Sequence, residues 1–396
     1  MTQVQRVSGT PKYVPSLEGM RGYAFFLVFL VHYFPAFQVG REGGLAFRIW
    51  TGFEPIGLLA VPVFFVLSGY LIGGILFNTR NRDGFFKVFY SRRVLRLFPM
   101  YFTVLLIIAC VEYFLKFPLD FHFWSHFLFI QNLFPDYVMH QHGPVMLIHY
   151  WSLATEEQFY LLWPLVVWLF PERRKLFGIG SLFILIICGI RFAAPYFFSY
   201  PEQIRYLSLT RVDAIIMGVL LALIRDEPIF DLIKPFAKWI ALAGVTALVV
   251  WALWNEEAWP KTFLGEQVMI PWVNFTSVAI IIAALEEKSW LERVCSQQWI
   301  CWLGKRSYSL YVIHFTYARW FWNYAIPHLS RHVPYRLALV VSGAMAFSLS
   351  ILLSMLSYRF IESPAQHLKE RFKYGPVKRG KSSRRLGDET LVKTGA

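Results

Sequence analysis

The first long apolar stretch of the chain carries two ionisable side chains, Arg21 and His32, eleven residues apart. At about 100° per residue, eleven residues make three helical turns plus roughly 20°, so both side chains share one helix face, about 16 Å apart along the axis. A neutral imidazole can act as general base for a hydroxyl group. The same spacing also fits a surface arginine above a histidine that hydrogen-bonds a neighbouring helix.

A second basic group, Arg92, Arg93 and Arg96, lies at the start of another apolar run. Arg93 and Arg96 are three residues apart and therefore share a helix face. Because a planar guanidinium suits phosphate binding, the pair predicts a site for a phosphorylated donor. The alternative is that these charges only orient the helix in the membrane, which explains Arg92 better than Arg96, since Arg96 lies inside the apolar run.

A third group, Ser152, Glu156 and Tyr160, recurs every four residues and shares one helix face. Glu156 could interact only with the helix dipole, or it could orient a histidine or bind a sugar hydroxyl. Further along the chain, Arg211 lies at the edge of another apolar run. For His314 and Glu362, taken alone, the surroundings favour a structural role, because packing and interface anchoring are sufficient to explain them.

The composition places all these residues in a membrane protein. Of the 396 residues, 56% are hydrophobic and only 16% charged, whereas a soluble domain has about 25% charged residues. A helix needs about 20 mostly apolar residues to cross the hydrocarbon core. We therefore predict an all-α integral membrane protein with about ten transmembrane helices, at the following residues: 22–37, 56–77, 94–115, 151–170, 177–197, 212–224, 236–254, 268–285, 308–324 and 337–358. The shorter apolar segment 121–134 is predicted to be re-entrant or interfacial.

The distribution of Lys and Arg predicts the orientation, since cytoplasmic loops retain these residues. With both termini cytoplasmic, 28 of the 39 fall in cytoplasmic segments and seven in outer loops. The net charge of +14 is then an orientation signal, and we expect membrane lipid rather than nucleic acid as a partner. The four Cys residues contain no C-x-x-C pair, so we expect no metal site. The predicted location is the cytoplasmic (inner) membrane.

The chain divides into three predicted segments. Residues 1–14 are a cytoplasmic N-terminal segment, and residues 15–368 form one membrane domain. Residues 369–396 are basic and rich in Gly and Ser, which predicts a disordered cytoplasmic tail.

Taken together, these motifs resemble the acyltransferase 3 family of multi-span membrane acyltransferases over about residues 15–368. The similar segments are an arginine, ten residues and a histidine (Arg21 to His32), R-x-x-R (93–96), W-S-L-x-x-E-x-x-F-Y (151–160), S-Y-S-L-Y (307–311) and I-E-x-P (361–364). Glu18 stands where family members often carry Asp, which keeps the carboxylate and lengthens its reach.

The resemblance implies transfer of an acyl group, commonly acetyl, from acyl-coenzyme A to a hydroxyl of a carbohydrate or glycolipid. It implies that His32 is the catalytic base and that Glu18 or Glu156 keeps the imidazole in the tautomer that can accept a proton. Alternatively, His32 carries the acyl group as an intermediate. The coenzyme's phosphates would meet Arg93 and Arg96.

The remaining predicted assignments complete this site. Arg21 and Arg92 are expected to assist in donor binding, and the residues expected to contact the acceptor are Ser152, Tyr160, Arg211 and His314. A competing interpretation is a secondary transporter or flippase for a lipid-linked sugar. Such proteins often contain internal repeats with paired broken helices, and the sequence shows no such pairing.

Overall fold

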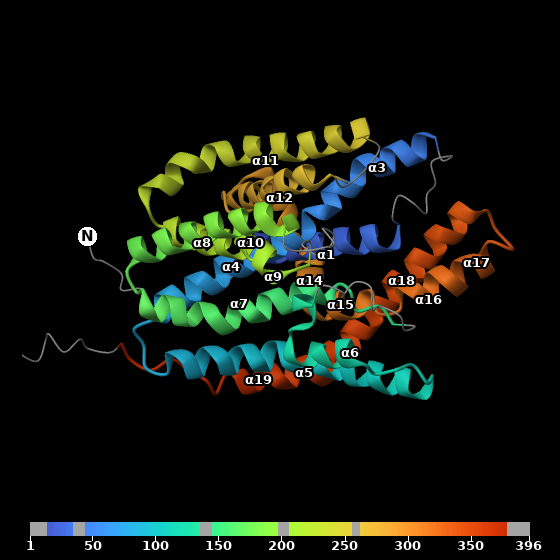
Figure 1. Cartoon of the computed structure of the whole chain (residues 1–396), viewed down its shortest axis with the longest axis horizontal. Helices are drawn as coiled ribbons and strands as arrows, with labels where there is room; N and C mark the ends of the chain where they lie inside the picture. The colour runs from blue at the N-terminus through green and yellow to red at the C-terminus, as the bar shows by residue number, and fades with distance from the viewer. Residues whose placement is uncertain (1–13, 35–43, 135–144, 197–205, 256–261, 378–396) are drawn as a thin grey trace, which may run out of the picture.

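The computed structural model describes residues 14–34, 44–134, 145–196, 206–255 and 262–377. Within these ranges the chain is almost entirely helical, and its long helices run roughly lengthwise through an elongated bundle (Figure 1). The described residues form no β-sheet, and their one isolated bridge joins Arg82 to Val377. The all-α class predicted from the sequence is thus confirmed.

The helices fall into a long set and a short set. The long helices are α1 (Pro15–Tyr33), α3 (Leu45–Leu58), α4 (Ala60–Thr79), α5 (Phe85–Phe114), α7 (Tyr150–Leu169), α8 (Arg173–Ala193), α10 (Asp213–Ile224), α11 (Pro228–Asn255), α12 (Phe263–Ala284) and α18 (Tyr335–Ser357). The short ones include α6 (Phe121–Ser125), α9 (Ser208–Arg211), α13 (Trp290–Cys295), α14 (Gln298–Lys305), α15 (Ser307–His314), α16 (Ala318–Trp320), α17 (Ile326–Leu329) and α19 (Ser363–Lys369).

Six helical segments of the described chain are long and apolar enough to cross a bilayer. They are Trp50–Thr79, Phe85–Phe114, Arg173–Ala193, Pro228–Asn255, Gln267–Ala284 and Tyr335–Lys369. This establishes a multi-pass membrane protein, whereas the number ten and the orientation stay predictions. The predicted spans outside this set fall on α1 and α7, which carry the polar site residues, on the twelve-residue α10, and on α15 with the short helices after it.

The ambiguous segment 121–134 contains only short helical turns. It forms the five-residue α6 and two 3₁₀ turns, η2 (His126–Leu128) and η3 (Gln131–Leu133). None of these turns is long enough to cross the hydrocarbon core, which is roughly 30 Å thick. The segment is tied to its neighbours by hydrogen bonds from Tyr101 Oη to the His126 carbonyl and from Asn132 to Ser208. An eleventh crossing at this place is therefore not supported.

Close helix packing fixes the helices that carry the candidate site. A Cβ atom at Gly304 of α14 would overlap the carbonyl oxygen of Glu18, and one at Gly22 would overlap the carbonyl of Ile300. Small residues allow this approach between membrane helices, where van der Waals packing drives association. The first half of α1, including Arg21, is thereby locked against α14.

Several turns with basic residues gather at one end of the bundle, on the left in Figure 1. We call this the basic end, and define it by the α4–α5, α7–α8 and α10–α11 turns with Arg80, Arg82, Arg173 and Arg225. An ion pair between Arg173 and Glu227 joins two of the turns.

The C-terminal residues 370–377 return to the basic end and hydrogen-bond the α4–α5 turn. The amide of Asp83 donates to the Pro376 carbonyl, and the amide of Gly375 donates to the Asp83 carbonyl. Backbone pairing thus holds residues 370–377, which fall within the segment predicted to be a disordered tail, against this turn. Residues 378–396 lie outside the described part of the chain, as do 1–13 of the predicted N-terminal segment.

Candidate active site

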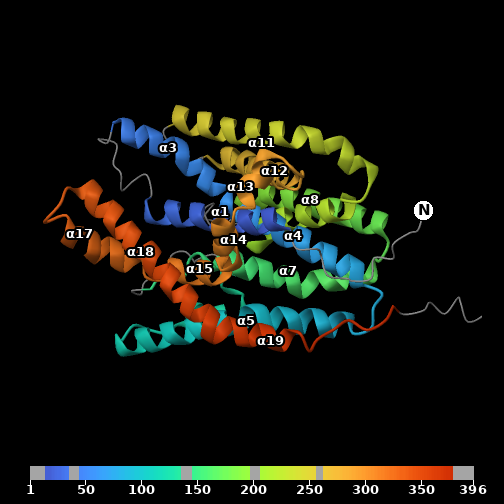
Figure 2. The same cartoon turned by 180° about the vertical axis from the view of Figure 1, so that it is seen from behind.

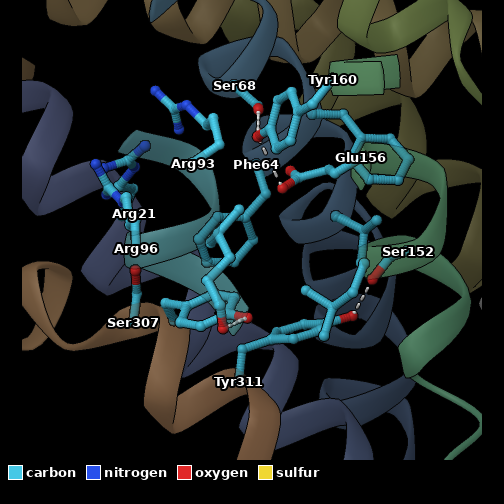
Figure 3. A pocket seen from close by; sticks show the side chains of 15 residues that line it. Arg21, Phe64, Ser68, Arg93, Arg96, Ser152, Glu156, Tyr160, Ser307 and Tyr311 are labelled. Carbon is cyan, nitrogen blue, oxygen red and sulfur yellow. Dashed lines mark hydrogen bonds between the residues drawn. The ribbon is translucent and has the colours of Figure 1, made fainter. Parts of the chain in front are cut away.

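A cavity of about 80 Å³ lies among α1, α4, α5, α7 and α15. Its polar walls are shown in Figure 3, and they carry Arg21, Ser68, Arg93, Arg96, Ser152, Glu156, Tyr160, Ser307, Tyr308 and Tyr311. Apolar side chains from α4, α5 and α7 complete the lining. Four of these helices lie far apart in sequence from α15, so the cavity exists only in the folded bundle.

Three arginines make the cavity strongly positive. Arg21, Arg93 and Arg96 gather on one side of the view in Figure 3, and Glu156 is the only carboxylate in the lining. Neither Arg93 nor Arg96 forms a hydrogen bond or ion pair with any described residue, while Arg21 lies 3.9 Å from Glu18. Unpaired cations are costly in a low-dielectric membrane interior, so this side of the cavity is suited to an anionic ligand.

The opposite wall is a hydrogen-bonded set on α7 and α4. Tyr160 Oη donates to Glu156 Oε2 at 3.1 Å and pairs with the Ser68 hydroxyl, as Figure 3 shows. The Arg93 guanidinium lies 5.3 Å from the centre of the Tyr160 ring. The predicted shared face of Ser152, Glu156 and Tyr160 is confirmed, since all three line the cavity.

Tyr311 joins the cavity to a group of three histidines. Its hydroxyl lies 2.7 Å from Ser152 Oγ, and its backbone carbonyl accepts a hydrogen bond from His314 Nδ1 at 2.8 Å. His314 Nε2 in turn lies 3.0 Å from His32 Nδ1, and the two rings are nearly parallel. His149 packs edge-on against His314, 5.1 Å between ring centres.

These contacts assign the tautomers of the two paired histidines. A carbonyl oxygen can only accept, so His314 carries its proton on Nδ1 and presents a lone pair on Nε2. His32 therefore donates from Nδ1, and its own lone pair is on Nε2. No described residue hydrogen-bonds His32 Nε2, and His32 is only half-buried. His32 is therefore held in the form that can accept a proton from a substrate hydroxyl.

A family model described as an acyltransferase domain matches residues 14–355, which include every residue of this cavity. The chain belongs to the acyltransferase 3 family. No solved structure matches it. Among the residues that the structure describes, no three His, Cys, Asp or Glu side chains are grouped to hold a metal ion.

Two relatives of this chain share a name that specifies O-acetyl transfer. The O-acetyltransferase OatA of Staphylococcus aureus strain NCTC 8325 is 29% identical over 406 residues, covering 95% of this chain and 61% of OatA. OatA of strain COL gives the same identity and coverage. The chain thus spans less than two thirds of the length of these relatives.

The structure places the predicted site residues in different parts of the bundle. Six of them line the cavity, namely Arg21, Arg93, Arg96, Ser152, Glu156 and Tyr160. His32 and His314 lie beyond Tyr311, outside the cavity lining. Glu18 lies beside Arg21.

Two predicted arginines point elsewhere. Arg92 Nε donates to the carbonyl of Phe372 at 2.7 Å, away from the cavity, because consecutive helical residues differ by about 100°. The Arg211 guanidinium lies 5.5 Å from the centre of a Trp151 ring.

Sequence reasoning missed the partner of His32. Neither Glu18 nor Glu156 holds its ring, since Glu156 accepts from Tyr160 and the neighbour of His32 is His314. Because 282 residues separate the two histidines in the sequence, no local sequence pattern could predict this pair. Ser68 was also missed, because a single serine in an apolar run is common in membrane helices. The S-Y-S-L-Y motif (307–311) was recognised, but no role in the site was assigned to Ser307 or Tyr311.

Proposed function

We propose that this membrane O-acyltransferase moves an acetyl group from acetyl-coenzyme A to a hydroxyl on a carbohydrate or glycolipid. The observation that carries the proposal is the hydrogen-bonded pair of His32 and His314, which leaves His32 Nε2 as a free proton acceptor. The family and the O-acetyltransferase relatives support the reaction class. The donor is inferred from the positive charge of the cavity, and the carbohydrate or glycolipid acceptor is inferred from the resemblance to the family.

A phosphorylated donor fits the charge of the cavity. Among the described residues, no anionic group forms a hydrogen bond or ion pair with Arg93 or Arg96, and a guanidinium can bind phosphate through two parallel hydrogen bonds. A cavity of about 80 Å³ is far smaller than the roughly 300–1,000 Å³ of sites that enclose a drug-sized ligand. The cavity therefore takes the diphosphate and the narrow arm of the donor, while the bulkier adenosine end remains outside it.

The chemical step assigned to His32 is general-base catalysis. His32 Nε2 removes the proton from the acceptor hydroxyl as the oxygen attacks the thioester carbonyl carbon. The carbon–sulfur bond then breaks, and the leaving thiolate takes the proton from the imidazolium. In a second route, Nε2 first attacks the thioester itself and the acceptor removes the acetyl group from the histidine.

The donor and acceptor would approach from different ends of the bundle. Arg21 lies in the first half of α1 and His32 in its last turn, about 16 Å further along the axis. If the basic end faces the cytoplasm, as the Lys and Arg distribution predicts, the donor enters there. The acceptor then reaches His32 from the outer side, and the acetyl group crosses part of the bilayer. For this to occur, the side chains around Tyr311 must open a path to His32.

The direct test is thiol release from acetyl-coenzyme A by the purified chain in proteoliposomes. Water serves as the default acceptor, and radiolabelled donor with a panel of free sugars tests transfer. We expect continuous thiol release from the wild type and its loss in His32→Ala. A transporter or flippase would leave the thioester intact, so an intact donor after long incubation contradicts the proposal.

A further inference from the structure

A second polar pocket, which we name the α5–α19 pocket, shares helix α5 with the cavity lined by Arg21, Arg93 and Arg96, which we call the arginine cavity. Its volume is about 310 Å³. α19 lies along α5 in both views of the molecule (Figures 1 and 2). The lining includes Arg92, Ser363, Gln366, His367, Lys369 and Glu370. No proposed step of the reaction uses these side chains, apart from the general expectation that Arg92 assists the donor.

Contacts with the C-terminal segment fix the orientation of the Arg92 side chain. Its Nε donates to the Phe372 carbonyl at 2.7 Å, and its guanidinium lies 5.6 Å from the centre of the Tyr374 ring. Its two terminal nitrogens form no hydrogen bond with a described residue. A guanidinium that is already oriented loses little freedom when it binds an anion.

Lys369 connects this pocket electrostatically to the arginine cavity. The positive charges of Arg96, Arg93 and Arg92 all act on its ammonium group. Neither Lys369 nor Arg92 forms an ion pair within the described chain, and Glu370 is the only carboxylate in the pocket lining. Four mutually repelling cations at this place are stabilised when an anion lies among them.

We propose that the α5–α19 pocket binds the 3′-phosphoadenosine end of the acyl-coenzyme A donor, an inference that rests on the proposed function. Coenzyme A carries two separate anionic groups, a ribose 3′-phosphate and a diphosphate. Arg92 and Arg93 are adjacent on α5 and differ by about 100° in direction. Arg92 therefore lines the α5–α19 pocket, and Arg93 lines the arginine cavity. A single extended ligand can thus place one anionic group at each arginine.

The polar side chains of the pocket favour a nucleotide over a simple phosphate group. Ser363 and Gln366 supply neutral donors and acceptors for ribose hydroxyls and base edges, and Glu370 accepts from them. The pocket is also about four times larger than the arginine cavity. An anionic lipid headgroup shares the phosphate chemistry but has no base edge for these additional groups to bind.

The test is equilibrium binding of adenosine 3′,5′-bisphosphate to the full chain in nanodiscs of phosphatidylcholine. We compare the wild type with Lys369→Gln and Arg92→Gln, and adenosine 5′-monophosphate serves as the ligand without the 3′-phosphate. The control variant is Lys175→Gln, which removes a positive charge from α8, where Lys175 forms an exposed ion pair with Glu172 at the helix N-cap.

We expect each pocket variant to bind the bisphosphate about tenfold more weakly, as for loss of one charge-assisted hydrogen bond. The monophosphate should bind wild type and variants alike, and Lys175→Gln should match the wild type. The proposal is overturned if both nucleotides bind equally well, if the pocket variants have no effect, or if phosphatidylglycerol in the nanodisc abolishes bisphosphate binding.

This design separates the pocket from the proposed function. Thiol release by a wild type that fails to bind the bisphosphate would reject the pocket and keep the enzyme. Selective bisphosphate binding without any turnover of acetyl-coenzyme A would keep the pocket as a nucleotide site and reject the acetyl transfer.

Discussion

Replacing His314 by alanine tests whether the histidine pair positions the proposed base. The change removes the acceptor that lies 3.0 Å from His32 Nδ1 and leaves that N–H without a partner. An unpaired donor away from water costs about 1–3 kcal/mol, which corresponds to a roughly fivefold to 150-fold loss of rate at about 1.4 kcal/mol per tenfold. We expect this loss in kcat, because His32 can then turn or adopt the other tautomer.

The Michaelis constant for acetyl-coenzyme A should change little in the same variant. The arginine cavity does not include His314, so the donor contacts are left in place. His314→Gln should recover part of kcat, because the glutamine amide oxygen can reach the position of the imidazole Nε2 and accept from His32. Initial rates of thiol release in proteoliposomes measure both parameters.

His149→Leu is the matched control for packing. His149 is as buried as His314 and lies 5.1 Å from it, but it forms no hydrogen bond to His32. We expect kcat of this variant to stay within a few-fold of the wild type. The positioning role is refuted if His314→Ala keeps full kcat, or if His149→Leu loses as much activity and His314→Gln recovers none.

Three further predictions concern the donor site, the topology and the helix packing. Arg96→Lys should raise the Michaelis constant for acetyl-coenzyme A roughly tenfold to a hundredfold and should not affect a short thioester without phosphates; equal effects on both donors would show that Arg96 is structural. In a chain lacking its native cysteines, a thiol introduced by Asp388→Cys should be labelled only after permeabilisation, and labelling in intact cells would reverse the orientation. Gly304→Leu should lower the melting temperature in detergent, because its side chain would overlap the backbone of Glu18 and overpacking costs about 1–3 kcal/mol; an unchanged melting temperature would contradict the close α1–α14 contact.

Periodicity and composition were sufficient to predict the features that depend on one helix. The common face of Ser152, Glu156 and Tyr160 follows from their four-residue spacing, and the apolar runs predicted the long helices. The same angular rule could have separated Arg92 from Arg93, since neighbouring positions on a helix point about 100° apart.

The features that depend on how helices meet could not be predicted locally. The pairing of His32 with His314 joins α1 to α15 across 282 residues, and Tyr311 contacts the cavity only because α15 packs beside α7. Residues 370–377 fall in the predicted tail because the composition of 369–396 was considered as a whole, whereas their own backbone pairs with the α4–α5 turn.

The most direct test of the central claim is the rate of thiol release from acetyl-coenzyme A by wild-type and His32→Ala proteins in proteoliposomes. Loss of a general base typically costs about 10²–10⁴-fold, so the variant should fall by that factor while its affinity for the donor is retained. Near-normal turnover by His32→Ala would contradict the account, because the residue held by His314 would then not be the catalytic base.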